Sequence, residues 1–458
     1  MTPVDRSRLP IPGPPPSFRF PPVVKRRLPN GLGVWTVEHR QSPVLAAVLV
    51  ARSGAAADPL DRPGLAAFTG DMLDEGSGNL SALDVQDGLA RLGAEVEIEV
   101  SADATALLLT TVARHGRRAL EILSDIAARP RLAEEDFLRV RDLRLNRLLQ
   151  LRHVPQALAD KAFLERLYGD HPYGHLAIGT EAGLRGITPA DVVSFHATRF
   201  RPSGAVLILA GDLTHDDGLR VAELAFGSWT DGSGAAPIFD RDADLARGLD
   251  GAGRGVAIVD RPQAPQAELR IGQVGADRRD PHYHALVVLN AILGGQFVSR
   301  INMKLRQEKG VTYGARTAFD FRRGRGPFSV ATSVDTAATV EAVREALVEL
   351  GDIRGARPAA AGELALAKAS LTSGYARHFE SAEQLARAAA QLALYDLPDD
   401  YFDRFVPLVG RVQVDEVTRV ANQHLDPDRL LTVVVGDYAS IGAGLAALGI
   451  GALALLAP

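Results

Sequence analysis

The feature that most constrains the fold is an internal repeat of a whole helix–turn–strand unit. The segment Ile187–Asp212 (ITPADVVSFHATRFRPSGAVLILAGD) aligns without a gap with Val412–Asp437 (VQVDEVTRVANQHLDPDRLLTVVVGD), at a constant offset of 225 residues (412 − 187 and 437 − 212). The matched positions include Asp191 with Glu416, Pro202 with Pro427, and Gly211-Asp212 with Gly436-Asp437. An ungapped match over a complete supersecondary unit indicates that the chain arose by duplication.

Each copy of the repeat predicts a capped amphipathic helix, a proline turn and a continuous apolar strand that stops at Gly-Asp. A further helix, His215–Phe226, is predicted after the first copy. The apolar end of the chain, Ala439–Pro458, is long enough to cross a membrane. Because it occupies the place of His215–Phe226 in the second copy, we interpret it instead as a helix followed by a last strand.

The repeat predicts two similar halves in a chain of 458 residues, which exceeds what one hydrophobic core usually organises. We predict a Pro-rich N-terminal arm (residues 1–21), an N-terminal domain (22–230), a linker rich in Gly, Asp and Ala (231–254) and a C-terminal domain (255–458). A hydrophobic content of 46% supplies enough apolar material for both cores.

The order of apolar patterns within a half predicts an α+β fold. Residues 45–54 and 106–114 read as strands, whereas residues 117–130 and 134–152 read as helices. Strands and helices therefore come in blocks rather than in strict alternation, which favours layered domains. We expect each half to be a mainly antiparallel sheet packed with helices.

Composition and missing motifs exclude several classes of function. The net charge of −5 argues against nucleic acid or anionic membrane as a partner. With no cysteine, the chain has no disulfide, thiolate metal site or cysteine nucleophile. It also lacks a nucleophile elbow, a phosphate loop, a dinucleotide fingerprint and a His-Glu-x-x-His pair. The N-terminus has no apolar core of a signal peptide, which predicts the cytoplasm, or the periplasm if the chain is a processed form.

Two close histidine pairs are candidates for metal ligands. They are His282-Tyr-His284 and His171-Pro-Tyr-Gly-His175. Neither spacing puts two imidazoles on one helix face, and neither pair has an acidic cluster nearby in sequence as a third ligand. We therefore interpret all four as surface or turn histidines.

Three strings in this order resemble the M16 metallopeptidases, the group of insulinase and mitochondrial processing peptidase. They are NGLGVWTVEHRQSPVLAAVLVARSGAAADPLDRPGLAAFTGDMLDEGS, LERLYGDHPYGHLAIGT and ILGGQFVSRINMKLRQEKGVTYGA, spread over nearly the whole chain. The size and duplication are similar to those of the M16B subfamily. The resemblance implies two homologous domains in this chain and a second subunit with which it encloses a chamber.

The zinc motif of the family is degenerate in this chain. Active members carry His-x-x-Glu-His on a helix, with two histidines that bind zinc, a glutamate that activates water, and a distal Glu ligand. In GLAAFTGDML the corresponding positions are Ala67, Gly70 and Asp71, and counting from Val154-Pro155 puts Arg147 at the distal Glu. The resemblance therefore implies that this chain binds no zinc there. Asp71 and Arg147 either form a salt bridge in the vacated pocket or both face solvent.

The second half keeps an Arg and a Tyr that the family uses. In LRQEKGVTYG, Arg306 is expected to end an amphipathic helix and Tyr313 to begin a strand. Spacing alone favours a helix-capping Arg and a packed Tyr. The resemblance instead implies that both donate hydrogen bonds to substrate peptide near the scissile carbonyl, beside a glycine-rich loop at Gly294 and Gly295.

Loss of the zinc ligands together with an intact Arg/Tyr pair predicts a division of labour. We expect a non-zinc-binding subunit, inactive alone, of a heterodimeric M16B zinc peptidase that acts on peptides. A homologous subunit with an intact His-x-x-Glu-His would supply the zinc and the Glu base. Two alternatives stay open: a structural relative, like the core subunits of respiratory complexes, and a stand-alone peptide-binding module without hydrolysis.

Overall fold

The computed structural model describes residues 18–231 and 253–456. The first half contains strands β1 (Val23–Arg27), β2 (Gly33–Glu38), β3 (Val44–Ala51), β4 (Gly76–Ser77), β5 (Leu80–Ser81), β6 (Glu95–Val100), β7 (Thr105–Val112) and β8 (Ala205–Gly211). Its helices are α1 (Leu65–Met72), α2 (Ala82–Arg91), α3 (Gly116–Ala128), α4 (Glu134–Leu151), α5 (Pro155–Tyr168), α6 (Glu181–Gly186), α7 (Pro189–Arg199) and α8 (His215–Phe226).

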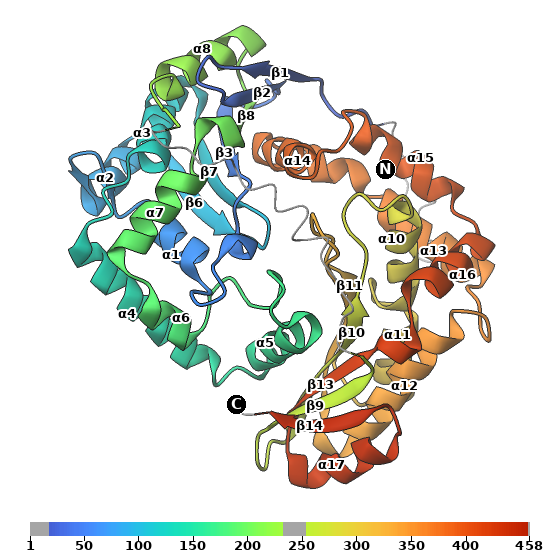
Figure 1. Ribbon diagram of the computed structural model, residues 1–458. Coiled ribbons are helices and arrows are strands. Elements are labelled where there is room, and N and C mark those ends of the chain that lie inside the picture. The colour runs from blue at the N-terminus through green and yellow to red at the C-terminus, as the bar shows by residue number, and fades with distance from the viewer. Residues whose placement is uncertain (1–17, 232–252, 457–458) are drawn as a thin grey trace, which may run out of the picture.

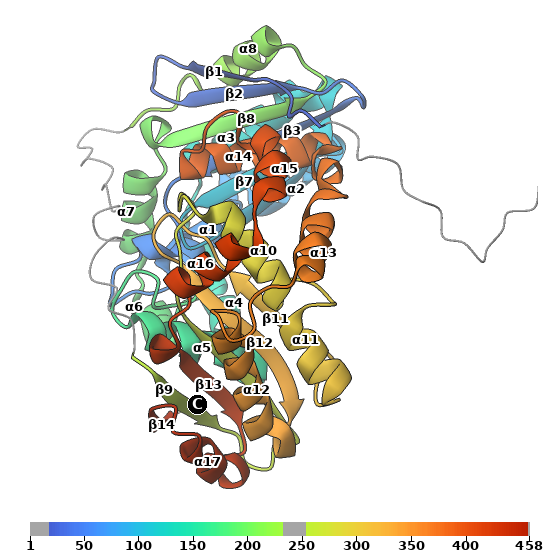
Figure 2. The ribbon, with the colours of Figure 1, turned by 90° about the vertical axis from the view of Figure 1, so that its right-hand side faces the viewer.

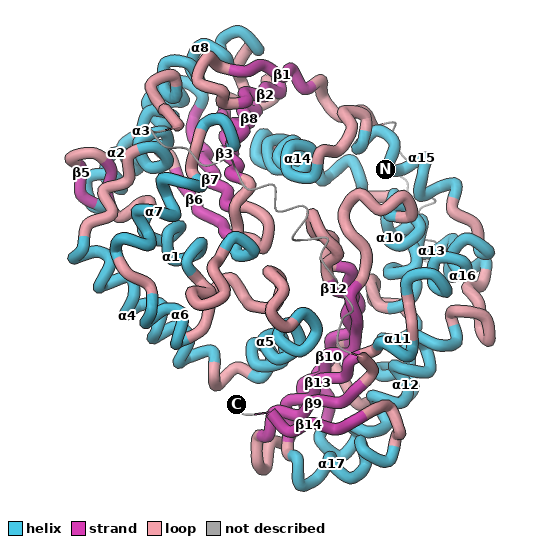
Figure 3. The backbone as a smooth tube through the Cα atoms, viewed as in Figure 1, coloured by secondary structure: helices cyan, strands magenta, loops and turns pink. Residues whose placement is uncertain are grey.

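The second half contains strands β9 (Gly255–Asp260), β10 (Gln266–Val274), β11 (Ala315–Phe319), β12 (Pro327–Asp335), β13 (Leu431–Gly436) and β14 (Ala452–Leu456). Its helices are α10 (Tyr283–Leu293), α11 (Arg300–Asn302), α12 (Thr339–Asp352), α13 (Ala361–Thr372), α14 (Ala382–Tyr395), α15 (Tyr401–Arg411), α16 (Val414–His424) and α17 (Tyr438–Ala447). A π-helical turn, Met303–Glu308, follows α11 directly. Figure 1 shows the two halves side by side, and Figure 3 shows helices surrounding the strands of each.

The two sheets share the order of five strands and differ in the strand at one edge, which confirms the two similar α+β halves predicted from the repeat. The strand orders are β1-β2-β8-β3-β7-β6 and β14-β9-β13-β10-β12-β11. The repeated strand, β8 or β13, pairs in parallel with the first long strand of its half, β2 or β9. The other pairs are antiparallel in both sheets, apart from β14, which runs parallel to β9. Both sheets are therefore mainly antiparallel.

The predicted elements of the repeat form in both copies. In the first copy, Thr188 caps α7, a 3₁₀ turn follows at Pro202–Gly204, and β8 ends at Gly211. In the second copy, α16, a turn at Pro427–Arg429 and β13 follow in the same order. The apolar end of the chain forms α17 and β14, as the repeat predicted. Within residues 18–231 and 253–456, no helix is long and apolar enough to cross a membrane.

Each half contributes one helix to the sheet of the other half. Helix α14 from the second half packs against β3 and β8, and α5 from the first half packs against β10 and β13. Figures 1 and 2, two views at right angles, both show α14 lying over the sheet of the first half. On β3, Ala46, Val48 and Val50 therefore join the core that includes α14, whereas the alternate residues pack on helices of their own half. This burial on both faces explains why these strands are continuously apolar.

The described end of the N-terminal arm also packs on the second half. Phe18 stacks on Phe379 with ring centroids 4.7 Å apart, and Phe20 lies 4.9 Å from the ring of Phe402. The remainder of the predicted arm (residues 1–17) and most of the predicted linker (232–252) lie outside the described residues. The two halves are thus joined by two exchanged helices and by this aromatic contact, in addition to the chain that connects them.

Candidate functional site

Arg306 lines a cavity of about 490 Å³ in the second half. The π-helical turn Met303–Glu308 carries Arg306, and the guanidinium carbon lies 4.6 Å from the ring centroid of Phe297, a cation–π distance. No carboxylate lies within ion-pair distance of Arg306 in residues 18–231 and 253–456. Its hydrogen-bond donors are therefore available to a ligand. A π turn is a frequent feature of functional sites because it displaces one side chain from the regular helical spacing.

The predicted glycine-rich loop lies in the same cavity. Gly294 ends α10, and its carbonyl accepts a hydrogen bond from the Thr317 backbone N–H at 3.2 Å. A Cβ on Gly294 would lie 2.5 Å from that nitrogen, so any larger residue would push α10 away from β11. Gly294 and Gly295 both line the cavity together with Arg306. The structure thus brings together three of the four substrate-site residues predicted in this half.

Tyr313 does not line this cavity and does not begin a strand. It lies in the loop before β11, which starts at Ala315, and 90% of its side chain is exposed. The prediction that Tyr313 begins a strand is wrong, because β11 begins two residues later, at Ala315. The phenol consequently projects into solvent, where a second molecule can reach it.

Thr312 holds the loop that presents Tyr313, a contribution that the sequence did not reveal. Its hydroxyl accepts from the Gly314 N–H at 3.0 Å and donates to the Ser333 carbonyl at 2.7 Å. It also lies 3.0 Å from the hydroxyl of Thr332. Tyr313 is therefore an exposed side chain on a fixed backbone, which lowers the conformational entropy lost when it binds.

Asn302 is a second positioning residue that sequence reasoning missed. Its side chain is buried and donates to the Phe297 carbonyl at 2.6 Å while it accepts from the Ala315 N–H at 2.9 Å. It thus ties the loop after Gly295 to the start of β11. The sequence contained a pattern that could have indicated Asn302. It precedes Arg306 by four residues, the interval that puts two residues on one helix face.

The wall of the same cavity includes part of an ionic cluster that joins the two halves. Glu268 on β10 lines the cavity, is 5% exposed and pairs with Arg270 at 2.5 Å. Arg270 also pairs with Asp160 on the exchanged helix α5 at 2.6 Å. Burial alone would lower the pKa of Arg270, but the hydrogen bonds that it donates to Asp160 and Glu268, together with their negative charges, outweigh burial and raise that pKa. Gln156 of α5 completes the wall and donates to Glu268 at 3.4 Å.

The degenerate zinc motif lies on α1 in the first half. Ala67 and Gly70 are buried, whereas Asp71 is half exposed. A Cβ on Gly70 would lie 2.9 Å from a methyl carbon of Val100 on β6, so the edge strand occupies the space beside this helix. Among these residues only Asp71 carries a group that can touch a metal.

Of the two alternatives left open for Asp71 and Arg147, the salt bridge between them does not form. Asp71 instead accepts a hydrogen bond at 2.6 Å from Arg144, which also donates to the carbonyls of Ala177 and Ile178. Arg147 follows Arg144 on α4 by three residues and is exposed. Arg147 thus faces solvent, as the second alternative had it, and Arg144, less than one helical turn away, is the arginine that faces α1 and pairs with Asp71.

These residues do not fit the zinc ion that the family motif binds. Zinc sites are built from histidine, cysteine and carboxylate ligands, and this pocket offers one carboxylate already paired with the buried Arg144. The fixed positive charge of the guanidinium opposes a dication at the same place. Loss of metal binding at this motif stays a prediction, and this donor set is the physical argument for it.

Of the two histidine pairs, His171 and His175 have structural roles. The Nε2 atom of His175 lies 3.0 Å from the carboxylate of Asp58, which also accepts hydrogen bonds from the N–H groups of Gly64 and Ala66 at the start of α1. His171 accepts from the backbone N–H of Tyr173 through Nδ1 at 3.1 Å. Both belong to a turn, in agreement with the interpretation from sequence.

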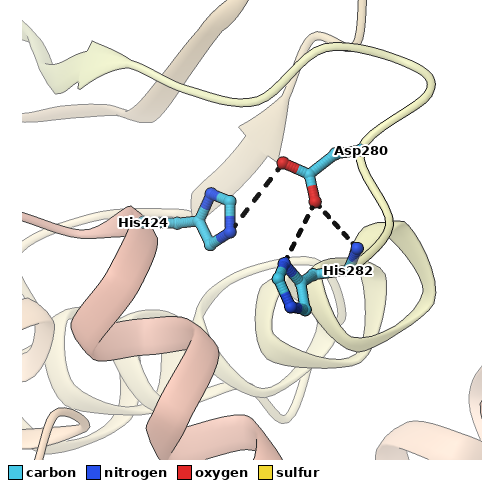
Figure 4. Close-up of side chains that lie close together, drawn as sticks. All are labelled: Asp280, His282 and His424. Carbon is cyan, nitrogen blue, oxygen red and sulfur yellow. Dashed lines mark hydrogen bonds and ion pairs between the residues drawn. The ribbon is translucent and has the colours of Figure 1, made fainter.

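His282 departs from that interpretation. Asp280, two residues before His282 in the sequence, lies beside it, and the structure brings His424 from the end of α16 to the same point (Figure 4). The partner of His282 is thus not His284, its neighbour in sequence, but a histidine from the far end of the second half. A sequence pattern limited to neighbouring residues could not have found His424 as a member of this cluster.

Comparisons with known proteins identify both halves. The insulinase model of peptidase family M16 matches residues 34–181, and the model described as the peptidase M16 inactive domain matches residues 186–371. An uncharacterized zinc protease of Mycobacterium leprae is 26% identical over 424 residues, covering 91% of this chain and 92% of the relative.

Solved structures show the same fold. A peptidase M16 inactive domain from Pseudomonas fluorescens superposes with a TM-score of 0.82 and 25% sequence identity, covering 91% of this chain and 98% of that one. A protease from Helicobacter pylori gives a TM-score of 0.83 at 18% identity, covering 91% of this chain and 99% of that one.

Proposed function

Because the chain belongs to the M16 peptidase family, we propose that it is the non-zinc-binding subunit of a heterodimeric M16B zinc peptidase. In this role it encloses the peptide chamber and presents Arg306 and Tyr313 to peptide bound at the site of its partner. The partner is a homologous chain with an intact His-x-x-Glu-His, which supplies the zinc that polarises the scissile carbonyl and activates water.

One observation carries the proposal: the first half lacks the side chains of a zinc site, whereas the second half offers free hydrogen-bond donors. The zinc positions hold Ala67, Gly70 and an Asp71 neutralised by Arg144. The Arg306 site, in contrast, keeps free guanidinium donors, a close glycine contact and an exposed tyrosine on an anchored loop. A purely structural descendant would have no need of an exposed Tyr313 on a loop that the hydroxyl of Thr312 anchors.

The chemistry follows from the donors themselves. Arg306 stays charged at any working pH and can donate hydrogen bonds from its guanidinium to a carbonyl oxygen or a developing oxyanion. The phenol of Tyr313, which lies outside the cavity and is exposed, adds one neutral donor. Both act on the peptide rather than on the metal, so this chain contributes binding and transition-state stabilisation without a base of its own.

The test is peptide hydrolysis with zinc present, measured for this chain alone, for a homologous chain from the same organism that has the intact motif, and for the mixture. We expect activity from the mixture only, accompanied by a heterodimer in gel filtration. Activity from this chain alone would contradict the proposal. A heterodimer that is no more active than the partner alone would favour the structural or peptide-binding alternatives.

The phenol of Tyr313 has its own predicted effect. Tyr313→Phe in the mixed enzyme should lower kcat/KM by roughly 10-fold, because one neutral hydrogen bond to the reacting group contributes about 0.5–1.5 kcal/mol. Since the side chain is 90% exposed, the melting temperature of the isolated chain should stay unchanged. Tyr438→Phe, at another exposed tyrosine, is the matched control and should leave kcat/KM at the wild-type value. Equal rates for the two variants would remove Tyr313 from the site.

A further inference from the structure

We propose that Asp280, His282 and His424 form a binding site for a divalent transition-metal cation of the Zn²⁺ class, separate from the degenerate motif on α1. The three side chains come from two segments: the loop before α10 with its capping residue, and the last residue of α16. One ligand atom from each residue lies within 4.8 Å of the other two.

The distances are close to those of a metal site. The His282 Nδ1 atom lies 3.3 Å from Asp280 Oδ1, and His424 Nε2 lies 3.8 Å from Asp280 Oδ2. Metal–ligand bonds of about 2.0–2.2 Å separate neighbouring ligand atoms by roughly 3.4 Å in a tetrahedron. The His282 distance matches this value, the His424 distance is longer, and all three ligand atoms lie within 4.8 Å of one another, so the site closes when His424 moves inward. Figure 4 shows both rings directed toward the carboxylate, one toward each oxygen.

The two ring nitrogens have no other use within the described part of the chain. Apart from the Asp280 carboxylate, at 3.3 and 3.8 Å, neither His282 Nδ1 nor His424 Nε2 has a partner there, and neither makes a well-formed hydrogen bond although both atoms are buried. A buried imidazole nitrogen without a partner costs free energy, and coordination to a cation would remove that cost. Two neutral imidazoles with one carboxylate form the ligand set that binds Zn²⁺ and related ions with room for a water.

Arg419 sets the tautomer of His282 and opposes metal binding in the arrangement seen here. It donates to His282 Nε2 at 3.1 Å, so the proton of the neutral ring lies on Nδ1. A metal at Nδ1 moves that proton to Nε2, where it would face another donor. Arg419 is 54% exposed and lies 3.4 Å from Glu416, so it can turn away toward that carboxylate. A residue that accepts from Nε2 would instead strengthen the site.

The position of the cluster gives the metal a structural consequence. His282 is the residue before α10, and Gly294, where α10 ends, lines the Arg306 cavity. The end of α16 next to His424 is held by Gln273 of β10, which donates to the His424 carbonyl at 3.0 Å. A cation joining these segments would fix the far end of the helix that carries the glycine-rich loop.

The test uses the full-length chain, stripped with chelator and then dialysed against Zn²⁺ or Co²⁺. We expect about one equivalent of metal to be retained, a rise of a few degrees in melting temperature with Zn²⁺, and visible absorption bands with Co²⁺. Asp280→Asn and His424→Gln should each lower the affinity at least 10-fold, while Arg419→Gln should raise it several-fold because the amide oxygen can accept from Nε2.

Two variants serve as matched controls. His153→Gln removes an exposed histidine elsewhere, and Asp71→Asn removes the remaining carboxylate of the degenerate motif; both should retain the metal. Retention that survives Asp280→Asn and His424→Gln in folded protein, or no retention by the wild type, would overturn the proposal. Loss of binding in Asp71→Asn alone would instead assign the metal to α1. Hydrolysis by the mixed enzyme does not enter this test, so its outcome is separate from that of the proposed function.

Discussion

Arg306→Ala in the mixed enzyme should lower kcat/KM by about 10²–10³-fold, which corresponds to roughly 3–4 kcal/mol of transition-state stabilisation. The effect is large because the guanidinium has no carboxylate partner among the described residues, so its donors are free for the peptide. Stability should change little, since the contact that is lost is one cation–π interaction with the half-exposed Phe297. Steady-state kinetics on a peptide substrate, with gel filtration of the mutant complex, measures both quantities.

Two further variants separate the charge of Arg306 from its geometry. Arg306→Lys keeps the positive charge but loses the planar fork, and should recover only part of the rate. Arg344→Ala changes an exposed arginine on α12 and should leave the rate unaffected. If Arg306→Ala and Arg344→Ala gave the same kcat/KM, the interpretation of the cavity as a peptide site would be wrong.

Arg270→Ala should lower the free energy of unfolding by about 3–5 kcal/mol, the cost of breaking a buried ion pair from one side. The substitution leaves Glu268, 5% exposed, without its counter-ion, whereas Asp160 is half exposed and can be solvated. Because Arg270 connects β10 with α5, the loss weakens the contact between the halves as well as the second sheet. Chemical denaturation followed by circular dichroism measures the change.

A double substitution and a surface pair provide the controls for Arg270. Adding Glu268→Gln to Arg270→Ala should recover much of the lost stability, because no charge is then left buried. Arg117→Ala breaks an exposed pair with Glu121 and should cost less than about 1 kcal/mol. A change for Arg270→Ala as small as that for Arg117→Ala would mean that water reaches Glu268 in the folded protein.

The sequence predicted most elements of the fold because the physical signals were local. The ungapped repeat located α7 with β8 and α16 with β13, and it predicted α17 and β14 in a segment that resembled a membrane span. The capping pattern of Thr188 and Asp191 and the turn at Pro202 lie within a few residues of each other, so they could be read without knowing the tertiary structure.

The sequence could not predict contacts that depend on the exact rotation of a helix or on distant segments. Arg144 and Arg147 lie on one helix less than a turn apart, and only the packing of α4 against α1 decides which of them meets Asp71. The pairing of His282 with His424 joins the two ends of the second half. The alanine-rich sequence of α14 indicates burial, but not that it covers the sheet of the other half.

The exchanged helix α14 also determines when the first half can finish folding on the ribosome. The strands of that half are all synthesised by residue 211, yet the face of β3 that carries Ala46, Val48 and Val50 is covered by residues 382–395. At a typical elongation rate of about 5–20 residues per second, this apolar face waits on the order of ten seconds for its cover. The nascent first half is therefore expected to bind chaperones that recognise exposed apolar strands. The time needed to translate the chain as far as residue 395 determines how long it needs them.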